Sequence, residues 1–205
     1  MSLLVVGTVA FDAIETPFGK TDKITGGSGN YICQSAGHFT NDMQLVSIIG
    51  DDFSQEELQY LQSIGTDIEG IEVKKGEKSF FWSGRYHMDL NRRDTLVTDL
   101  NVLANFDPVL PEKYKDAEFL ILGNIDPALQ AKVITQMVER PKLIAMDTMN
   151  FWMDIAMDNL KTTLKMVDLL IVNEEEARQL TNEYSLVRAA AAIREMGPKY
   201  LIIKN

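Results

Sequence analysis

The chain has 205 residues, of which 45% are hydrophobic and 24% are charged, and its net charge at pH 7 is −10. This composition is typical of a globular protein long enough to bury one α/β core, and the negative charge argues against nucleic-acid binding, which needs clustered Lys and Arg. One cysteine, Cys33, excludes an intrachain disulfide, and no apolar run approaches the ~20 residues of a membrane span. These features predict a cytoplasmic protein without a membrane partner.

Apolar runs of strand length alternate along the chain with segments of helical period. The predicted buried strands are 3–10, 44–49, 119–122, 143–146, 169–172 and 200–203. The predicted helices are 31–39, 54–64, 127–140, 174–180 and 186–196. Alternation of this kind is typical of a parallel sheet with helices on its faces. The sequence therefore predicts a Rossmann-like three-layer α/β domain over residues 1–205.

Two stretches, at about 13–25 and 71–98, do not follow this rhythm. The second carries the aromatic residues of Phe80-Phe81-Trp82 and Tyr86, which suit a pleated, partly covered surface. We predict that the two stretches are insertions that form a small separate sheet; the alternative is an ordinary surface hairpin.

Cations lie in the second stretch. They are Arg85 and those of Asn91-Arg92-Arg93, and on a mobile segment they could close over a phosphoryl group. Solvated side chains and surface ion pairs are the alternative. His87 is predicted to be a surface imidazole, because no partner for it is evident in the sequence.

Asp12 follows the first predicted strand, and Gly26-Gly27 precede the first predicted helix. Open α/β sheets place ligands at the carboxyl ends of their strands, where a carboxylate can accept hydrogen bonds from two sugar hydroxyls. Glycines permit close approach of a ligand, and the helix after them begins with unpaired N–H groups. A turn or helix cap is the alternative for Asp12, and position alone leaves both open. A dinucleotide fingerprint is excluded, because Ile32 stands where its third glycine belongs.

Other predicted strands also end in polar groups. These are Gly50-Asp51-Asp52, Gly123-Asn124-Ile125-Asp126, Asp147-Thr148-Met149-Asn150 and Asn173-Glu174-Glu175-Glu176. Each has a structural alternative: Asp51 suits a turn, Asp126 suits an N-cap, and the three glutamates suit the first turn of a helix.

The order strand, Asp12, Gly26-Gly27, helix, strand, Gly50-Asp51-Asp52 resembles the start of the ribokinase-like (PfkB) carbohydrate and nucleoside kinases, and the resemblance runs over the whole chain. It implies that Asp12, Gly26, Gly27 and Asn124 bind the acceptor. In that family an Asn that hydrogen-bonds the substrate follows the glycines. Tyr31 stands at its position and Asn30 one residue earlier, so both are candidate ligands. The resemblance also makes the small sheet a substrate lid and a possible homodimer contact.

Asn173, Glu176 and the following Ala177 resemble the Asn-x-x-Glu motif of the same kinases. The resemblance implies that Asn173 and Glu176 bind the phosphates of ATP and organise Mg²⁺, usually through water, with Glu176 as the metal-site residue. Hard oxygen ligands around a partly hydrated ion are what Mg²⁺ prefers.

The family's Gly-Ala-Gly-Asp segment, which supplies the anion hole and the catalytic base, has no counterpart in the 205 residues. We therefore expect the C-terminal part of the fold and the base beyond residue 205, and this chain alone to be inactive. The implied reaction is ATP-dependent phosphorylation of a hydroxyl on a sugar or related small carbohydrate. The alternatives are a nucleoside (adenosine-type) kinase and a non-catalytic sugar- or nucleoside-binding remnant.

Overall fold

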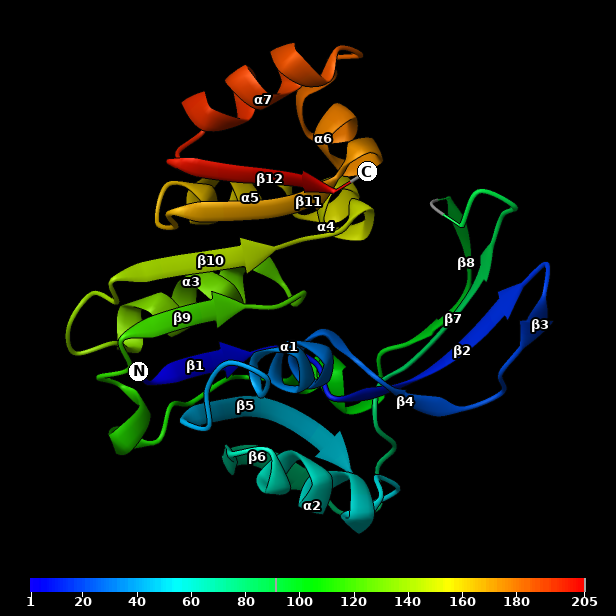
Figure 1. The fold of residues 1–205 in the computed structure, drawn as a ribbon, viewed down its shortest axis with the longest axis vertical. Helices are drawn as coiled ribbons and strands as arrows, with labels where there is room; N and C mark the ends of the chain where they lie inside the picture. The colour runs from blue at the N-terminus through cyan, green and yellow to red at the C-terminus, as the bar shows by residue number, and fades with distance from the viewer. Residues whose placement is uncertain (91, 205) are drawn as a thin grey trace. The chain divides into compact units, whose positions relative to one another are not determined.

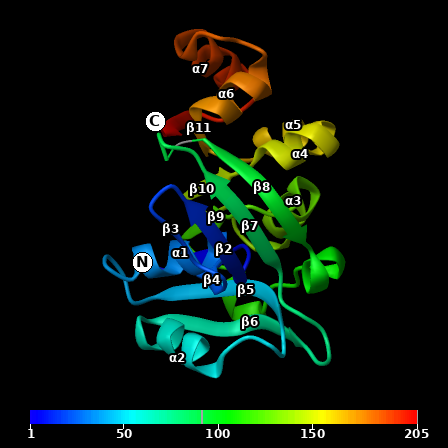
Figure 2. The same ribbon diagram turned by 90° about the vertical axis from the view of Figure 1, so that its right-hand side faces the viewer.

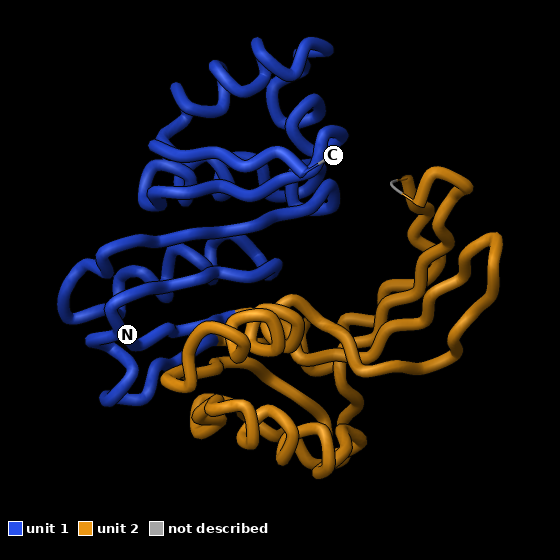
Figure 3. The backbone as a smooth tube through the Cα atoms, in the orientation of Figure 1, with its two compact units in different colours: residues 1–6, 108–205 blue, residues 7–107 orange. Residues whose placement is uncertain are grey.

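The computed structural model describes residues 1–90 and 92–204, so Asn91 and Asn205 lie outside the described residues. The chain forms two compact units, each with its own colour in Figure 3. Unit 1 contains residues 1–6 and 108–205, and unit 2 contains residues 7–107. Within the described range, no helix is long and apolar enough to cross a bilayer.

Unit 1 is built on a parallel sheet whose strand order is β12-β11-β10-β9-β1. The strands are β1 (Leu3–Val6), β9 (Phe119–Leu122), β10 (Leu143–Asp147), β11 (Leu169–Asn173) and β12 (Tyr200–Lys204). The helical segments are η2 (Glu112–Tyr114), α3 (Pro127–Gln136), α4 (Asn150–Ile155), α5 (Met157–Leu164), α6 (Glu174–Thr181) and α7 (Leu186–Glu195). Helix α3 packs against α5, and α6 packs against α7 beside β12 (Figure 1).

The core of unit 1 follows from the apolar strands. Leu120, Leu122, Ile144 and Met146 are almost completely inaccessible to solvent. Four of the predicted strands, at 119–122, 143–146, 169–172 and 200–203, therefore match β9 to β12, and they confirm an α/β fold with a parallel sheet.

Unit 2 contains the parallel pair β5 (Met43–Gly50) and β6 (Thr66–Lys74). Helix α1 (Ser28–Ala36) packs on β5, and α2 (Gln55–Ser63) packs on β6. A short 3₁₀ helix, η1 (Asn101–Asn105), lies beside β5. The sequence pattern does not predict β6 as a strand of this pair.

The second sheet of unit 2 joins the two stretches that depart from the βαβ rhythm. Its strands are β2 (Ala10–Thr16), β3 (Gly19–Lys20), β4 (Ile24–Gly26), β7 (Phe81–Tyr86) and β8 (Arg93–Asp99). The order is β3-β2-β7-β8, and β4 also pairs with β2. Figure 2 shows β2, β7 and β8 side by side. We call these five strands the lid sheet.

Several predicted boundaries were wrong. The helix predicted at 31–39 is α1 at Ser28–Ala36, and the helix predicted at 127–140 ends at Gln136. The strand predicted at 3–10 is two strands, because β1 ends at Val6 and β2 begins at Ala10. The chain leaves the ladder at Gly7, where an added Cβ would lie 2.8 Å from Oγ of Ser28. Residues 71–74 belong to β6, whose pairing with β5 continues to Lys74, so the second lid segment begins only at Phe81.

Candidate active site

Asp12 lies inside β2 of the lid sheet, between Ile24 on β4 and Trp82 on β7. Its carboxylate accepts a hydrogen bond from the backbone N–H of Gly27. Burial raises the pKa of Asp12 to about 6, and the Gly27 N–H only partly offsets this effect. A carboxylate can accept about four hydrogen bonds. Asp12 therefore fixes the glycine loop and keeps capacity for further donors.

The two glycines are needed for this packing. A Cβ on Gly26 would lie 2.1 Å from Oδ2 of Asp12, which is far inside any permitted contact. Gly27 has a φ of +93°, and a Cβ there would lie 2.4 Å from the carbonyl oxygen of Thr8. Larger residues at either position would displace the carboxylate or the loop.

The first N–H groups of α1 are already paired. Ser28 N donates to Oγ1 of Thr8 at 2.9 Å, and Gly29 N donates to the carbonyl oxygen of Thr8 at 2.8 Å. Asn30 N donates to the same carbonyl at 3.3 Å. The expectation that this helix end offers unpaired N–H groups to a ligand was therefore wrong.

Asn30 and Tyr31 have opposite environments. Asn30 is 1% exposed, its Oδ1 accepts a hydrogen bond from Gln34, and its Nδ2 has no partner in the described part of the chain. Tyr31 is 47% exposed and donates its hydroxyl to the carbonyl oxygen of Thr25 at 3.4 Å. Burial raises the pKa of Tyr31, and the charges of Asp12 and Tyr86 raise it further. Of these two residues, Tyr31 is the one whose side chain is shown to lie near Asp12.

Gly50, Asp51 and Asp52 hold the loop that follows β6. Asp51 Oδ2 accepts a hydrogen bond from Gly76 N at 2.8 Å, and Asp52 Oδ1 accepts two from Ser79, at 2.8 Å from N and 2.7 Å from Oγ. A Cβ on Gly50 would lie 2.2 Å from the carbonyl oxygen of Glu77. These contacts agree with the turn interpretation of the motif.

An open pocket of 540 Å³ lies between the lid sheet and the start of α2. Its lining residues are Phe11, Lys23, Ile24, Thr25, Ser54 and Glu57. Phe11 and Asp12 are consecutive residues of a strand, so their side chains point to opposite faces. None of the predicted acceptor ligands lines this pocket, and we do not assign the acceptor to it.

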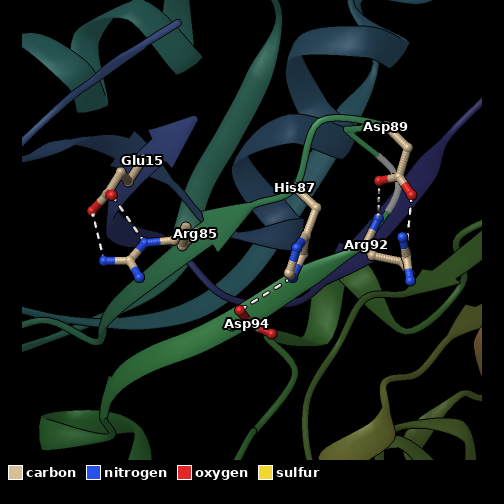
Figure 4. Close-up of polar contacts among 6 residues, drawn as sticks. All are labelled: Glu15, Arg85, His87, Asp89, Arg92 and Asp94. Atoms are coloured by element: carbon tan, nitrogen blue, oxygen red, sulfur yellow. Dashed lines mark hydrogen bonds and ion pairs between the residues drawn. The ribbon is translucent and has the colours of Figure 1, made fainter. Parts of the chain in front are cut away.

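Polar side chains of the lid sheet and of the segment between β7 and β8 pair with one another, as Figure 4 shows. The pairs are Arg85 Nε with Glu15 Oε1 at 2.9 Å, His87 Nε2 with Asp94 Oδ2 at 3.1 Å, and Arg92 Nε with Asp89 Oδ2 at 2.9 Å. His87 has a partner after all. Arg85 is held on β7 by an acidic residue, which agrees with the surface-ion-pair alternative.

In unit 1, Asn124 follows β9 and binds neighbouring side chains. Its Oδ1 accepts a hydrogen bond from Nε1 of Trp152 at 2.8 Å, and its Nδ2 donates to the sulfur of Met149 at 3.0 Å. Asp126 caps α3, because Oδ1 accepts a hydrogen bond from Ala128 N at 2.8 Å. The amide of Asn124 thus positions α4.

Asn173 and Glu176 form a reciprocal capping box at the start of α6. Glu176 N donates to Oδ1 of Asn173, and Asn173 N donates to Oε2 of Glu176, both at 2.8 Å. Glu176 is 4% exposed. One oxygen of each side chain is therefore already used to close the helix end.

Asp147 lies at the end of β10. The sequence predicts a polar group at this strand end but no role for Asp147. Burial raises its pKa to about 7; the charge of Lys204 opposes this rise, and that of Glu176 adds to it. Its Oδ1 is buried without a partner in the described residues. We call Asp147, Asn173, Glu176 and Lys204 the strand-end cluster. Across the described range, no group of three or more His, Cys, Asp or Glu side chains could hold a metal by itself.

Comparison with known families supplies the class of the protein. The family described as pfkB family carbohydrate kinase matches residues 2–205. The chain belongs to this family. Family membership supports a phosphotransferase, and it agrees with the resemblance found in the sequence.

Individual relatives agree with the family. The chain is 28% identical to a cytidine kinase of Thermococcus kodakarensis, covering 99% of this chain and 72% of that protein. The fold is similar to the nucleoside kinase of Burkholderia thailandensis solved with inosine, with a TM-score of 0.79, 16% identity, and coverage of 100% of this chain and 70% of that one. A ribokinase-like protein of E. coli solved with ATP and Mg²⁺ gives a TM-score of 0.74 at 20% identity, covering 99% of this chain and 72% of that one.

Proposed function

We propose that this pfkB-family protein is a cytoplasmic, ATP-dependent kinase that phosphorylates a hydroxyl of a sugar ring, either free or as the ribose of a nucleoside. The observation that carries the proposal is the Asp12 carboxylate packed on Gly26, with one backbone donor and a raised pKa. A desolvated carboxylate with unused acceptor capacity suits a pair of neighbouring hydroxyls, because each hydroxyl donates one hydrogen bond to it.

Asp12, Gly26, Gly27 and Tyr31 are the residues proposed to hold the acceptor. Gly26 and Gly27 keep the loop close to the carboxylate, and Tyr31 lies near it. Asn30 is buried beneath this surface and is proposed to support α1 rather than to contact the acceptor. Asn124 is retained as a weaker acceptor candidate, because its amide already binds Trp152 and Met149.

The strand-end cluster is proposed to serve Mg²⁺ and the phosphates of ATP. The test of fit is the buried Oδ1 of Asp147, which has no partner among the described residues and lies near the charges of Lys204 and Glu176. A cation beside the two carboxylates would add to the stabilisation that Lys204 supplies. The capping box uses the only side-chain oxygen of Asn173 and one of the two oxygens of Glu176. These residues would therefore hold the ion through water. When bound, Mg²⁺ neutralises charge on the phosphates during transfer. The E. coli relative solved with ATP and Mg²⁺ supports the choice of these two ligands.

The proton acceptor is not among the residues assigned here. We propose that residues 1–205 alone, which contain no Gly-Ala-Gly-Asp segment, transfer a phosphoryl group far more slowly than a kinase that has one. The lid sheet is also proposed as a homodimer surface. Its edge strand β8 exposes Leu96 and Val97, which supports that proposal.

Calorimetric titration with ribose and with cytidine tests the acceptor site. Asp12→Ala should weaken binding by about 30- to 1,000-fold, the equivalent of about 2–4 kcal/mol for two lost hydroxyl contacts. Glu15→Gln is the matched control, because Glu15 lies on the same strand and faces away from Asp12. Equal acceptor affinity in the two variants would contradict the proposal.

A further inference from the structure

Trp82 shares a face of the lid sheet with Asp12. The two residues are cross-strand partners in the register between β2 and β7, and this register runs without a bulge from Phe11 to Glu15. Alternation along the strands places Gly84 and Tyr86 on the same face as Trp82. Arg85 and its partner Glu15 lie on the other face.

The indole of Trp82 is held in one orientation. A Cβ on Gly84 would lie 2.1 Å from Cη2 and 2.4 Å from Cζ2 of Trp82, so the ring lies directly over the bare backbone of Gly84. Nε1 donates to Oγ1 of Thr95 at 3.3 Å, and the guanidinium of Arg93 lies 5.8 Å from the ring centroid. The indole therefore extends along β7 from position 82 to position 84, a span of about 6–7 Å.

The spacing between β2 and β7 suits a ligand that consists of a sugar ring and a planar base. Neighbouring strands are about 4.8 Å apart, so a sugar ring held by Asp12 would bring a substituent of that ring within reach of the indole. The ring of Tyr31 lies near both Asp12 and Tyr86, because the charges of these two residues raise its pKa. A free sugar has no planar group to place on this aromatic surface.

We propose that Trp82, held flat by Gly84, is the specificity-determining residue that stacks on the base of the acceptor, and that the acceptor is a nucleoside rather than a free sugar. This inference rests on the proposed function, because it assumes that Asp12 binds the ribose hydroxyls. Stacking of a base on an aromatic side chain strengthens binding by roughly 10- to 100-fold. It tolerates different bases, since every base has a π-face.

The chain carries two tryptophans, Trp82 and Trp152, so fluorescence can follow the proposed contact. Cytidine should quench the emission of the wild-type protein, and Trp82→Phe should abolish that change while Trp152 still emits. Trp82→Ala should lower the affinity for cytidine by roughly 10- to 100-fold and leave the affinity for ribose unchanged. Circular dichroism of each variant verifies that it folds.

Gly84→Ala gives a second test that keeps the tryptophan. The added methyl displaces the indole, so cytidine affinity should fall as in Trp82→Ala. Ser83→Ala is the matched control, because Ser83 is the neighbouring residue on the opposite face. Unchanged cytidine affinity in both Trp82→Ala and Gly84→Ala, with binding still lost in Asp12→Ala, would overturn the stacking role alone. A wild-type protein that binds neither ribose nor cytidine would overturn the proposed function with it.

Discussion

Asp12 in unit 2 and Glu176 in unit 1 are both carboxylates beside the start of a helix, and the structure uses them differently. Within the described residues, Asp12 accepts one backbone hydrogen bond, from Gly27, and its pKa is raised to about 6. Glu176 is almost fully buried and closes a capping box with Asn173. The first carboxylate is desolvated without being saturated, whereas the second already stabilises its own helix.

The difference arises from the residues beside each carboxylate. Gly26 leaves no side chain between the backbone and Asp12, so a ligand and the loop can approach the same group. Asn173 instead supplies a side chain that pairs with Glu176. A perturbed, partly unsatisfied carboxylate is the better indicator of a binding site, because structural pairing leaves less capacity for a ligand. Substitutions beside Asp12 should therefore weaken acceptor binding, whereas substitutions in the capping box should lower the free energy of unfolding.

Gly26→Ala should have the largest effect. The methyl group would lie 2.1 Å from Oδ2 of Asp12, so the carboxylate must move. Displacement of a positioning group by about 1 Å can cost on the order of 100-fold in rate, and we expect a loss of at least that order in acceptor affinity. Calorimetry with ribose and cytidine measures it.

Gly37→Ala is the control for this substitution. Gly37 has a φ of −59°, and the nearest atom to its added Cβ would be 3.3 Å away. Its acceptor affinity should stay close to that of the wild type. Comparable losses in the two variants would mean that the first effect is a general cost of removing glycine.

Acceptor affinity should also depend on pH through Asp12. Hydroxyls donate to the ionised carboxylate, so with a pKa of about 6 the affinity should fall about tenfold between pH 7 and pH 5. Titrations across this range, repeated with Asp12→Asn, provide the measurement. A slope that persists in Asp12→Asn would assign it to another group.

The raised pKa of Asp12 also makes the stability of the fold depend on pH, and stability should fall over the pH range in which acceptor affinity rises. The folded pKa of Asp12 is above the ordinary value of 3.8, so the folded state binds the proton more tightly than the unfolded state. The tighter proton binding adds to the free energy of unfolding below about pH 4, and this addition is lost as pH rises through about 6. Denaturant unfolding of wild type and Asp12→Asn should diverge over that window.

Periodicity in the sequence was sufficient for the parallel sheet, because buried parallel strands are continuous apolar runs. It missed β6, whose residues are mostly only partly buried and carry Asp67, Glu69 and Glu72. It also missed α4 and α5, two short helices separated by one residue, Ala156. Short or half-exposed elements owe their structure to tertiary packing more than to local pattern.

The candidate site was predictable where the chemistry is local. Asp12, Gly26 and Gly27 were candidates from the sequence, and the structure brings them together. The spacing of Asn173 and Glu176 is that of a capping box. Partners distant in the chain were not predictable. Arg85 pairs with Glu15 across 70 positions, and the N–H groups of α1 are bound by Thr8 across about 20. Burial of Asp147 depends on the packing of neighbouring elements and has no local signal.

Asn173→Ala tests the structural role of the capping box. It removes the cap of α6, so the free energy of unfolding should fall by about 1 kcal/mol. Glu176→Gln should cost less stability, because an amide can still accept the hydrogen bond of the capping box. It removes charge, however, and should weaken the binding of Mg²⁺ with ATP.

The control for both is Glu175→Gln, which alters an exposed glutamate in the same helical turn. Denaturant unfolding and titration with Mg²⁺ and ATP separate the two roles. Equal Mg²⁺–ATP affinity in Glu176→Gln and Glu175→Gln would show that the role of Glu176 is purely structural.

The smallest effect should come from Arg85→Met, which retains most of the aliphatic length and removes the charge. Arg85 pairs with Glu15 where both side chains are about half exposed, and exposed pairs contribute about 0–1 kcal/mol. If Arg85 instead acted on the transferring phosphoryl group, its loss would cost about 100- to 1,000-fold in rate, as the loss of other electrostatic donors does. Residual phosphoryl transfer from ATP to cytidine or ribose, measured at high protein concentration for the wild type and Arg85→Met, distinguishes the two. We expect equal rates, because Arg85 faces away from Asp12 and its guanidinium is already bound by Glu15.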